Sequence, residues 1–143
     1  ASRCEAGGLG WVVERGTGSV AERAEVSGCV VKRLRRRMRI ECEPKMLNGR
    51  TGGGSLGRGL RRSALAKAAN AWNTYQNDGL PPTPIANPGA ESIAAVLNPA
   101  DSRALFFVAD GTGGHAFSVT YAEHQRNVAR WRQIERARRI AGD

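Results

Sequence analysis

The chain has 143 residues, a length that suits one ordinary domain with a real core and excludes two independent ones. Apolar residues make up 41% and charged residues 24%, which excludes a disordered chain, and no stretch approaches the roughly 18 uninterrupted apolar residues of a membrane helix. The formal net charge of +9 indicates an anionic partner, whether nucleic acid, an acidic membrane surface or an acidic cell-wall polymer. We therefore expect a single domain over residues 1–143.

Two helices are predicted in the first 40 residues. Residues 11–18 begin as an apolar run and end in glycines, which is typical of the last turns of a buried helix and places Glu14 beside the core. Residues 19–22, Ser-Val-Ala-Glu, form a capping box, and apolar residues then recur at helical spacing to about Arg37. The basic run 32–39 is either a solvated helix end, whose cations suit the helix dipole, or an anion-binding surface.

The middle of the chain predicts loops around one short helix. The glycine-rich stretch 49–59 is typical of a flexible loop, and Ser63 can cap a short helix through about Ala69. Residues 79–89 contain four prolines, which fix the backbone of a rigid non-helical stretch. Asn87 followed by a proline is a good N-cap for a helix that stops before Pro99.

The last 40 residues predict a hairpin and a long helix. Residues 104–109 are rich in strand formers, 110–114 have turn chemistry, and 115–118 can return as the second strand. Residues 120–123, Thr-Tyr-Ala-Glu, form another capping box, and the helix they begin carries apolar residues on one side and arginines on the other. The fold class is therefore α+β, with several short to medium helices packed on a small antiparallel sheet that includes this hairpin.

Metal and cofactor sites find little support in the residues present. Cys4, Cys29 and Cys42 are spaced neither as a CxxC metal pair nor as a disulfide framework, and two histidines offer little to a zinc site. The stretch 49–59 lacks the ending of a phosphate-binding loop, so the sequence predicts no metal, no nucleotide and no other cofactor. The N-terminus lacks the order of a signal peptide, so any membrane anchor of the parent protein is expected outside this chain.

With these pieces in order, the chain resembles the YceG/MltG-like family of endolytic murein transglycosylases, from about Leu9 to Arg130. The most specific parts of the resemblance are Trp72-Asn73-Thr74-Tyr75, the stretch 79–89 (GLPPTPIANPG) and the hairpin 105–118. The catalytic motif of the family, Ile-Val-Glu-Lys-Glu-Thr, appears as residues 12–17, Val-Val-Glu-Arg-Gly-Thr, so Glu14 matches the catalytic glutamate and Gly16 replaces the second glutamate. Lys32, Glu41, Glu43 and Asn48 also stand where the family has other residues.

The resemblance implies a reaction that needs one carboxyl group. Ordinary glycoside hydrolysis uses two. In a lytic transglycosylase a single glutamic acid protonates the glycosidic oxygen between N-acetylmuramic acid and N-acetylglucosamine, then accepts the proton of the muramoyl C6 hydroxyl as a 1,6-anhydro ring closes. Such a group needs a pKa raised above about 4.3. We expect Trp11, Val12 and Val13 to provide apolar surroundings that raise the pKa of Glu14, and the rigid loop 79–89 to line the cleft beside it.

Five further residues are candidates for substrate contacts. Glu41 and Glu43 could act as an extra acid or bind substrate. Asn73 and Tyr75 could hydrogen-bond sugar amides or hydroxyls, or they could tie the proline-rich loop to the core. Asn87 is expected to be a helix cap first and a ligand contact second, while His115 is expected to be structural.

The function implied by the resemblance is cleavage of peptidoglycan glycan strands at internal sites, on the periplasmic face of the bacterial inner membrane, with the cell-wall synthesis machinery as a further partner. Two alternatives stay open. A degenerate family member would bind peptidoglycan without cutting it. A basic module for nucleic acid would use the run 32–39 and the arginine-rich last helix, although the chain has no recognised nucleic-acid motif and we expect no sequence-specific binding.

Overall fold

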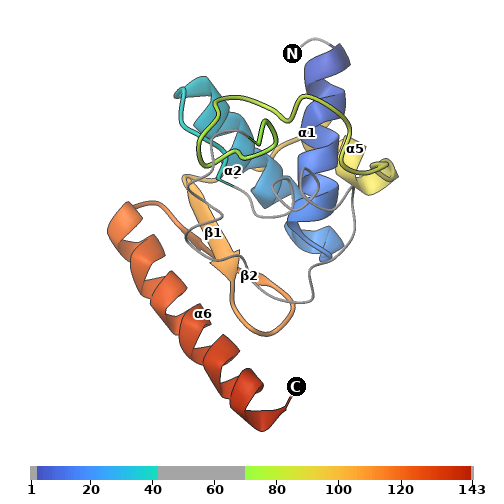
Figure 1. Cartoon of the computed structure of the whole chain (residues 1–143). Coiled ribbons are helices and arrows are strands. Elements are labelled where there is room, and N and C mark those ends of the chain that lie inside the picture. Colours follow the sequence, from blue (N-terminus) through green and yellow to red (C-terminus); the bar gives the residue numbers. More distant parts are fainter. Residues whose placement is uncertain (1–2, 42–69, 143) are drawn as a thin grey trace.

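The computed structural model describes residues 3–41 and 70–142, with side chains from residue 8 onward. In chain order the elements are helix α1 (Arg3–Gly16), the 3-10 turn η1 (Val20–Glu22), helix α2 (Arg23–Arg35), helix α5 (Ala90–Leu97), strands β1 (Phe106–Ala109) and β2 (His115–Ser118), and helix α6 (Tyr121–Ala141). Figure 1 shows α1, α2 and α5 gathered at one end, with the β1–β2 hairpin below them and α6 running beside it. The predicted α+β class is confirmed.

The core lies where α1, α2 and α5 meet. Val12 and Val13 of α1 and Val26 and Val30 of α2 are fully buried, and fully burying one valine contributes roughly 1.5–3 kcal/mol. The two α2 valines are four residues apart, so they share one helix face. This packing confirms that residues 11–16 end a buried helix.

A glycine in α2 allows the segment after α5 to approach closely. A Cβ at Gly28 would lie 2.6 Å from the carbonyl oxygen of Ala100, which is too close for any side chain. The backbone N–H of Ala100 donates to the carbonyl of Ala24 at 2.8 Å, one turn earlier on the same helix. The chain is thereby fixed against α2 as it passes from α5 to the hairpin.

The predicted hairpin and the cap of the last helix are both confirmed. β1 and β2 pair antiparallel, with Phe106 opposite Ser118 and Ala109 opposite His115. The Thr120 hydroxyl accepts the backbone N–H of Glu123 at 3.2 Å, and the Glu123 carboxylate accepts the N–H of Thr120 at 3.3 Å. These bonds fix the start of α6 at the end of β2.

The capping box predicted at Ser19 is wrong. The Ser19 side chain makes no cap hydrogen bond, and the Glu22 side chain binds His115 of β2 instead of returning to the Ser19 amide. Residues 20–22 therefore form only a 3-10 turn before α2. A long-range partner outcompetes the local cap, because His115 offers both a ring nitrogen and a backbone N–H.

Two other helix bounds differ from prediction. α2 ends at Arg35, and Arg37 has a φ of 54°, so the helix does not reach Arg37. The N-cap of α5 is Gly89, so the predicted capping role of Asn87, which is exposed, is wrong. The predictions for residues 49–59 and 63–69 lie outside the described residues.

Candidate active site

Glu14 lies in the last turn of α1, where α1 meets the beginnings of α2 and α5. Its Oε2 accepts two hydrogen bonds, from the Ser92 hydroxyl at 2.6 Å and from the backbone N–H of Gly89 at 3.0 Å. Its Oε1 accepts a longer bond from Nη2 of Arg23 at 3.4 Å. The side chain is 27% exposed, so the carboxyl group is both well bonded and accessible from one side.

The pKa of the Glu14 carboxyl lies below its ordinary value. The hydrogen bond from Ser92 is the main cause, followed by the bond from the Gly89 backbone, and the positive charge of Arg23 adds to them; burial acts in the opposite direction and is outweighed. The expectation of a raised pKa is therefore wrong for the free chain. Val12 and Val13 are buried in the core between the helices, while polar donors surround the carboxylate.

Arg23 connects Glu14 to the start of α5. Its Nη1 lies 3.7 Å from Oε2 of Glu91, and its side chain is only 11% exposed. Within the described residues its Nε is buried and has no hydrogen-bond partner. This guanidinium is therefore placed between two carboxylates, and its charge favours the ionised form of Glu14.

The proline-rich loop 79–89 packs along α1 beside Glu14, as predicted. Arg15 donates from Nε to the carbonyl of Ile85 at 3.2 Å, and the loop ends at Gly89, which binds Glu14. At Gly10 a Cβ would lie 3.2 Å from the ring of Pro88. These contacts show that the loop lies next to Glu14 and that Gly89 binds its carboxylate, while a substrate cleft lined by the loop stays a prediction.

A second polar cluster lies beside the first and joins the helices to the hairpin. Oε2 of Glu22 lies 2.8 Å from Nδ1 of His115 and accepts the Thr17 hydroxyl at 3.2 Å, while its Oε1 accepts the backbone N–H of His115 at 3.0 Å. Burial tends to raise the pKa of Glu22, but the hydrogen bonds from His115 and Thr17 outweigh it and the pKa is lowered. A Cβ at Gly114 would lie 2.7 Å from Oε1 of Glu22, so a larger residue there would displace the carboxylate from its bonds to His115.

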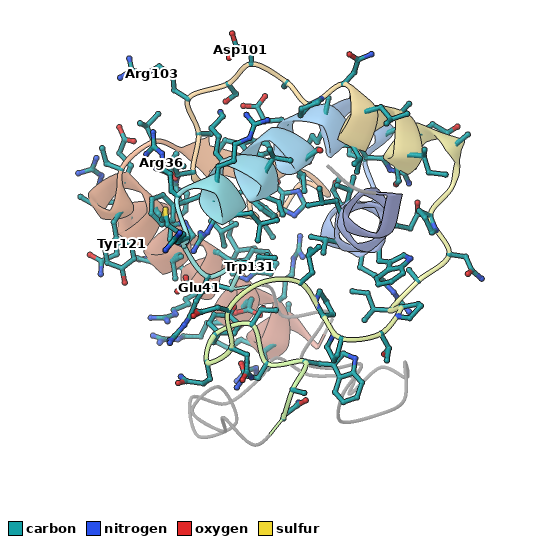
Figure 2. All side chains as sticks on the ribbon, turned by 90° about the horizontal axis from the view of Figure 1, so that it is seen from above. Arg36, Glu41, Asp101, Arg103, Tyr121 and Trp131 are labelled. Carbon is teal, nitrogen blue, oxygen red and sulfur yellow. The ribbon has the colours of Figure 1, made fainter. Side chains whose placement is uncertain are left out.

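Two surface cavities lie near the hairpin, and Glu14 lines neither. The first, about 560 Å³, lies between the start of α6, β2 and the segment that contains Arg103. The second, about 320 Å³, is called the hairpin cavity here; its walls are residues 15–18 after Glu14, the hairpin turn, and Trp131 and Arg138 of α6. The two cavities share no lining residue, and Figure 2 places Arg103 of the first well apart from Trp131 of the second.

Glu41 lies away from Glu14, at the other end of α2. Its carboxylate pairs with Nη2 of Arg33 at 3.1 Å, near the end of α2, whereas Glu14 pairs with Arg23 at its beginning. Ten residues of helix separate the two arginines, which is about 15 Å at 1.5 Å per residue. A contact between Glu41 and substrate stays a prediction, and Glu43 lies outside the described residues.

The remaining candidates differ in exposure. The side chain of Asn73 is fully buried, and its Oδ1 accepts the backbone N–H of Tyr75 at 3.1 Å. The carbonyl of Tyr75 accepts from Nη1 of Arg39 at 3.0 Å. The first bond closes a local turn and the second joins it to the segment after α2; neither reaches the loop 79–89, so both interpretations of Asn73 and Tyr75 stay predictions. Asn87 is exposed two residues before Gly89, where a glycan contact stays a prediction.

The basic run 32–39 is not one continuous surface. Arg33 is 6% exposed and donates to the carbonyls of Arg39 and Leu105 as well as to Glu41, so it is part of the interior. Arg39 pairs with Asp78 at 3.0 Å. The arginines at 35–37 are exposed at the end of α2, so the exposed part of the run is short, and both interpretations of it stay predictions.

Sequence reasoning missed Ser92, Arg23, Thr17 and Glu22 as neighbours of the site. Ser92 carries the clearest signal, because a serine lies three residues before Ala95 on the buried face of an otherwise apolar helix. A buried hydroxyl needs a partner, and here the partner is Glu14. For Glu22 the capping-box pattern hid the long-range bond to His115.

Comparison with known proteins identifies the relatives. The model of the YceG-like family matches residues 7–130. The chain is 30% identical over 115 residues to an endolytic murein transglycosylase of Bacillus subtilis and 31% identical over 123 residues to one of Streptococcus pneumoniae strain D39; these alignments cover 80% and 82% of the chain. A crystal structure of a YceG-like protein of Listeria monocytogenes superposes with a TM-score of 0.74 at 31% identity, over 82% of this chain.

These relatives are much longer than the matched region. The aligned part is 31% of the Bacillus protein, 22% of the Streptococcus protein and 38% of the Listeria chain. In the part of the chain that the structure describes, no helix is long and apolar enough to cross a membrane. Within the same residues no group of three or more His, Cys, Asp or Glu side chains could bind a metal ion.

Proposed function

The chain belongs to the YceG-like family, and we propose that it is the catalytic part of an endolytic murein transglycosylase that cleaves the bond between N-acetylmuramic acid and N-acetylglucosamine, leaving a 1,6-anhydro end. One observation carries the proposal: Glu14, at the family's motif position, is an accessible carboxyl group at the junction of α1, α2 and α5, and it is bonded by the Gly89 backbone and by Ser92. The names of the Bacillus and Streptococcus relatives support the same activity.

In the proposed reaction the Glu14 carboxylic acid donates its proton to the glycosidic oxygen as the bond from that oxygen to C1 of the muramoyl ring breaks. The muramoyl C6 hydroxyl then forms the new bond to C1, and its proton passes to the Glu14 carboxylate. The acid is thereby regenerated and no water is consumed. One residue acts first as acid and then as base, which is why a second carboxylate near Glu14 is not required.

The lowered pKa of Glu14 sets a condition on this chemistry, because only the protonated form can start it. A glycan bound over the exposed side of Glu14 removes water from the carboxylate, and this desolvation raises the pKa. The Ser92 hydroxyl can serve both forms, since it donates to a carboxylate and accepts from a carboxylic acid. The N–H of Gly89 and the guanidinium of Arg23 can only donate, so they favour the carboxylate that accepts the C6 proton.

The site of action in this proposal is the cell wall outside the cytoplasm, on the periplasmic face of the inner membrane, with glycan strands as substrate. The cell-wall synthesis machinery is the further partner that we propose. A chain that binds peptidoglycan without cutting it is the second candidate, and the low pKa of Glu14 together with Gly16 in the catalytic motif favours it.

The test is incubation of purified peptidoglycan with this chain, followed by mass spectrometry of the soluble products. We expect muropeptides with 1,6-anhydromuramoyl ends that appear in proportion to enzyme and time. Reducing ends would indicate a hydrolase and overturn the proposed reaction. Binding to peptidoglycan without any new ends would select the second candidate.

A further inference from the structure

The hairpin cavity begins immediately after Glu14 in the chain. Arg15, Gly16, Thr17 and Gly18 form one wall, and Arg15 also binds the carbonyl of Ile85 in the proline-rich loop. The cavity wall therefore begins at the residue after Glu14 in the chain, within one helical turn of it, so a polymer that lies over Glu14 beside this loop can extend to the cavity. Its volume, about 320 Å³, is at the lower end of the roughly 300–1,000 Å³ of small-molecule sites.

The wall formed by the hairpin turn is rigid and bare of side chains. Gly111 and Gly113 have φ values of 92° and 96°, which residues with a side chain rarely adopt. A Cβ at Gly111 would lie 2.9 Å from Cδ1 of Ile134, and Gly114 lies against Glu22. Glycine at these positions leaves backbone N–H and C=O groups next to the cavity, where a hydroxyl or an acetamido group can reach them.

The wall formed by α6 provides an aromatic ring and a fixed cation. The Arg138 guanidinium lies 5.8 Å from the centre of the Trp131 ring and donates to the carbonyl of Gly111, so it orients the indole against the hairpin turn. The face of a pyranose ring that carries axial C–H groups is apolar and weakly positive, which suits the negative face of an indole ring. The arginine adds donors for ring hydroxyls.

From this combination we propose that the hairpin cavity is a saccharide subsite, which binds one N-acetylhexosamine ring of the glycan strand next to the bond that Glu14 cleaves. The proposal deepens the function above and rests on it for the identity of the polymer. Trp131 is the main contact to the sugar ring, Arg138 is the positioning residue that fixes the indole, and the glycine wall provides backbone hydrogen bonds. The cavity thereby sets where along the strand the cut falls.

The test uses the Glu14→Gln chain, so that binding is measured without cleavage, with N-acetylglucosamine tetramer as the probe. Isothermal titration calorimetry gives the affinity, and the three indole N–H resonances in a ¹⁵N NMR spectrum report which tryptophan is near the sugar. We expect Trp131→Ala to weaken binding by about three- to tenfold and Trp131→Phe to retain most of it. The control is Tyr121→Ala, which removes an exposed aromatic residue of the same helix outside the cavity and leaves the affinity unchanged.

Each outcome bears on one proposal. Equal affinity of Trp131→Ala and the parent, or a Trp131 resonance that stays fixed while another indole shifts, overturns the subsite. Binding through Trp131 by a chain that never releases anhydro ends keeps the subsite and overturns the transglycosylase function. The last outcome uses the Trp131→Ala variant that retains Glu14. If it cleaves glycan with an unchanged KM and unchanged product lengths, the transglycosylase function stands and the subsite is overturned. Circular dichroism of each variant separates loss of binding from loss of fold.

Discussion

Two carboxylates at the junction of α1 and α2, Glu14 and Glu22, have much in common. Their side chains are 27% and 23% exposed, each accepts three hydrogen bonds, and the pKa of each is lowered. The two carboxylates differ in the segments that supply their hydrogen-bond donors. The donors to Glu14 are Arg23 and two residues at the start of α5. The donors to Glu22 are Thr17 and His115 of the hairpin, and Gly114 packs against its carboxylate.

This comparison shows that burial, hydrogen bonds and pKa direction do not by themselves identify a catalytic group. Glu22 would pass those three criteria as well as Glu14. The assignment of chemistry to Glu14 depends on the motif at residues 12–17 and on the rigid loop that ends at Gly89 beside the carboxylate. A structural role for Glu22 follows from its partners, because two of its three hydrogen bonds come from His115 and join the hairpin to the turn before α2.

The largest effect is expected from Glu14→Gln. General acid–base steps are typically worth about 10²–10⁴-fold, and one residue here would serve both halves of the reaction, so formation of anhydro ends should fall by the top of that range or more. The glutamine oxygen can still accept from Ser92 and Gly89, so the melting temperature should change little. Initial rates of anhydro-product release, measured by mass spectrometry beside the melting temperature, check both parts. Near-normal activity of this variant would mean that another residue acts as the catalytic acid.

Glu22→Ala should have the opposite profile, with a loss of stability rather than a specific loss of chemistry. The change leaves the His115 ring, its backbone N–H and the Thr17 hydroxyl without their acceptor, so the free energy of unfolding should fall by roughly 2–4 kcal/mol. Urea unfolding measures it. Asp101→Ala, which removes an exposed carboxylate, is the control and should stay within about 0.5 kcal/mol of the parent.

Ser92→Ala should change the pH dependence of the reaction rather than its presence. Ser92 is the main reason that the pKa of Glu14 is low, so its removal raises the pKa toward the ordinary value. The protonated form then persists to higher pH, and the alkaline limb of the rate profile should move upward. The control is Ser102→Ala, a serine whose hydroxyl binds a backbone amide away from Glu14. An unmoved alkaline limb would show that Ser92 does not set the pKa of the acid.

The fold and the site were predictable to different degrees, for physical reasons. The hairpin, the Thr120 cap and the end of α1 follow from local patterns, because their bonds join residues close in sequence. The bond between Glu22 and His115 joins positions 93 residues apart, and no local pattern encodes it. The raised pKa expected from Val12 and Val13 failed for the same reason, since the donors to Glu14 come from α5.

The smallest effect expected is on the pH dependence of stability. It shows how much each of the two carboxylates, Glu14 and Glu22, contributes to the stability of the fold. A carboxyl group whose pKa is lower in the folded chain than in the unfolded chain stabilises the fold above its ordinary pKa of 4.5, and this contribution is lost as the pH falls through the lower folded value. The pKa of both Glu14 and Glu22 is lowered in the folded chain, so both contribute stability that is lost on acidification. The parent chain should therefore lose stability as the pH falls from about 5.

Glu22→Ala and Glu14→Gln each remove one titrating group, so each should flatten this pH dependence while differing at neutral pH. In Glu22→Ala the stability is already low at pH 7 and falls less on acidification, because the contribution that acid removes is absent from the start. Glu14→Gln begins slightly below the parent, because the ion pair with Arg23 is lost, and it also falls less. Melting temperatures of the three chains between pH 7 and pH 3 measure this, with Asp101→Ala expected to follow the parent curve. If Glu22→Ala fell as steeply as the parent, the hydrogen bonds from His115 would not be what lowers the pKa of Glu22, and the contrast between a structural and a chemical carboxylate would lose its basis.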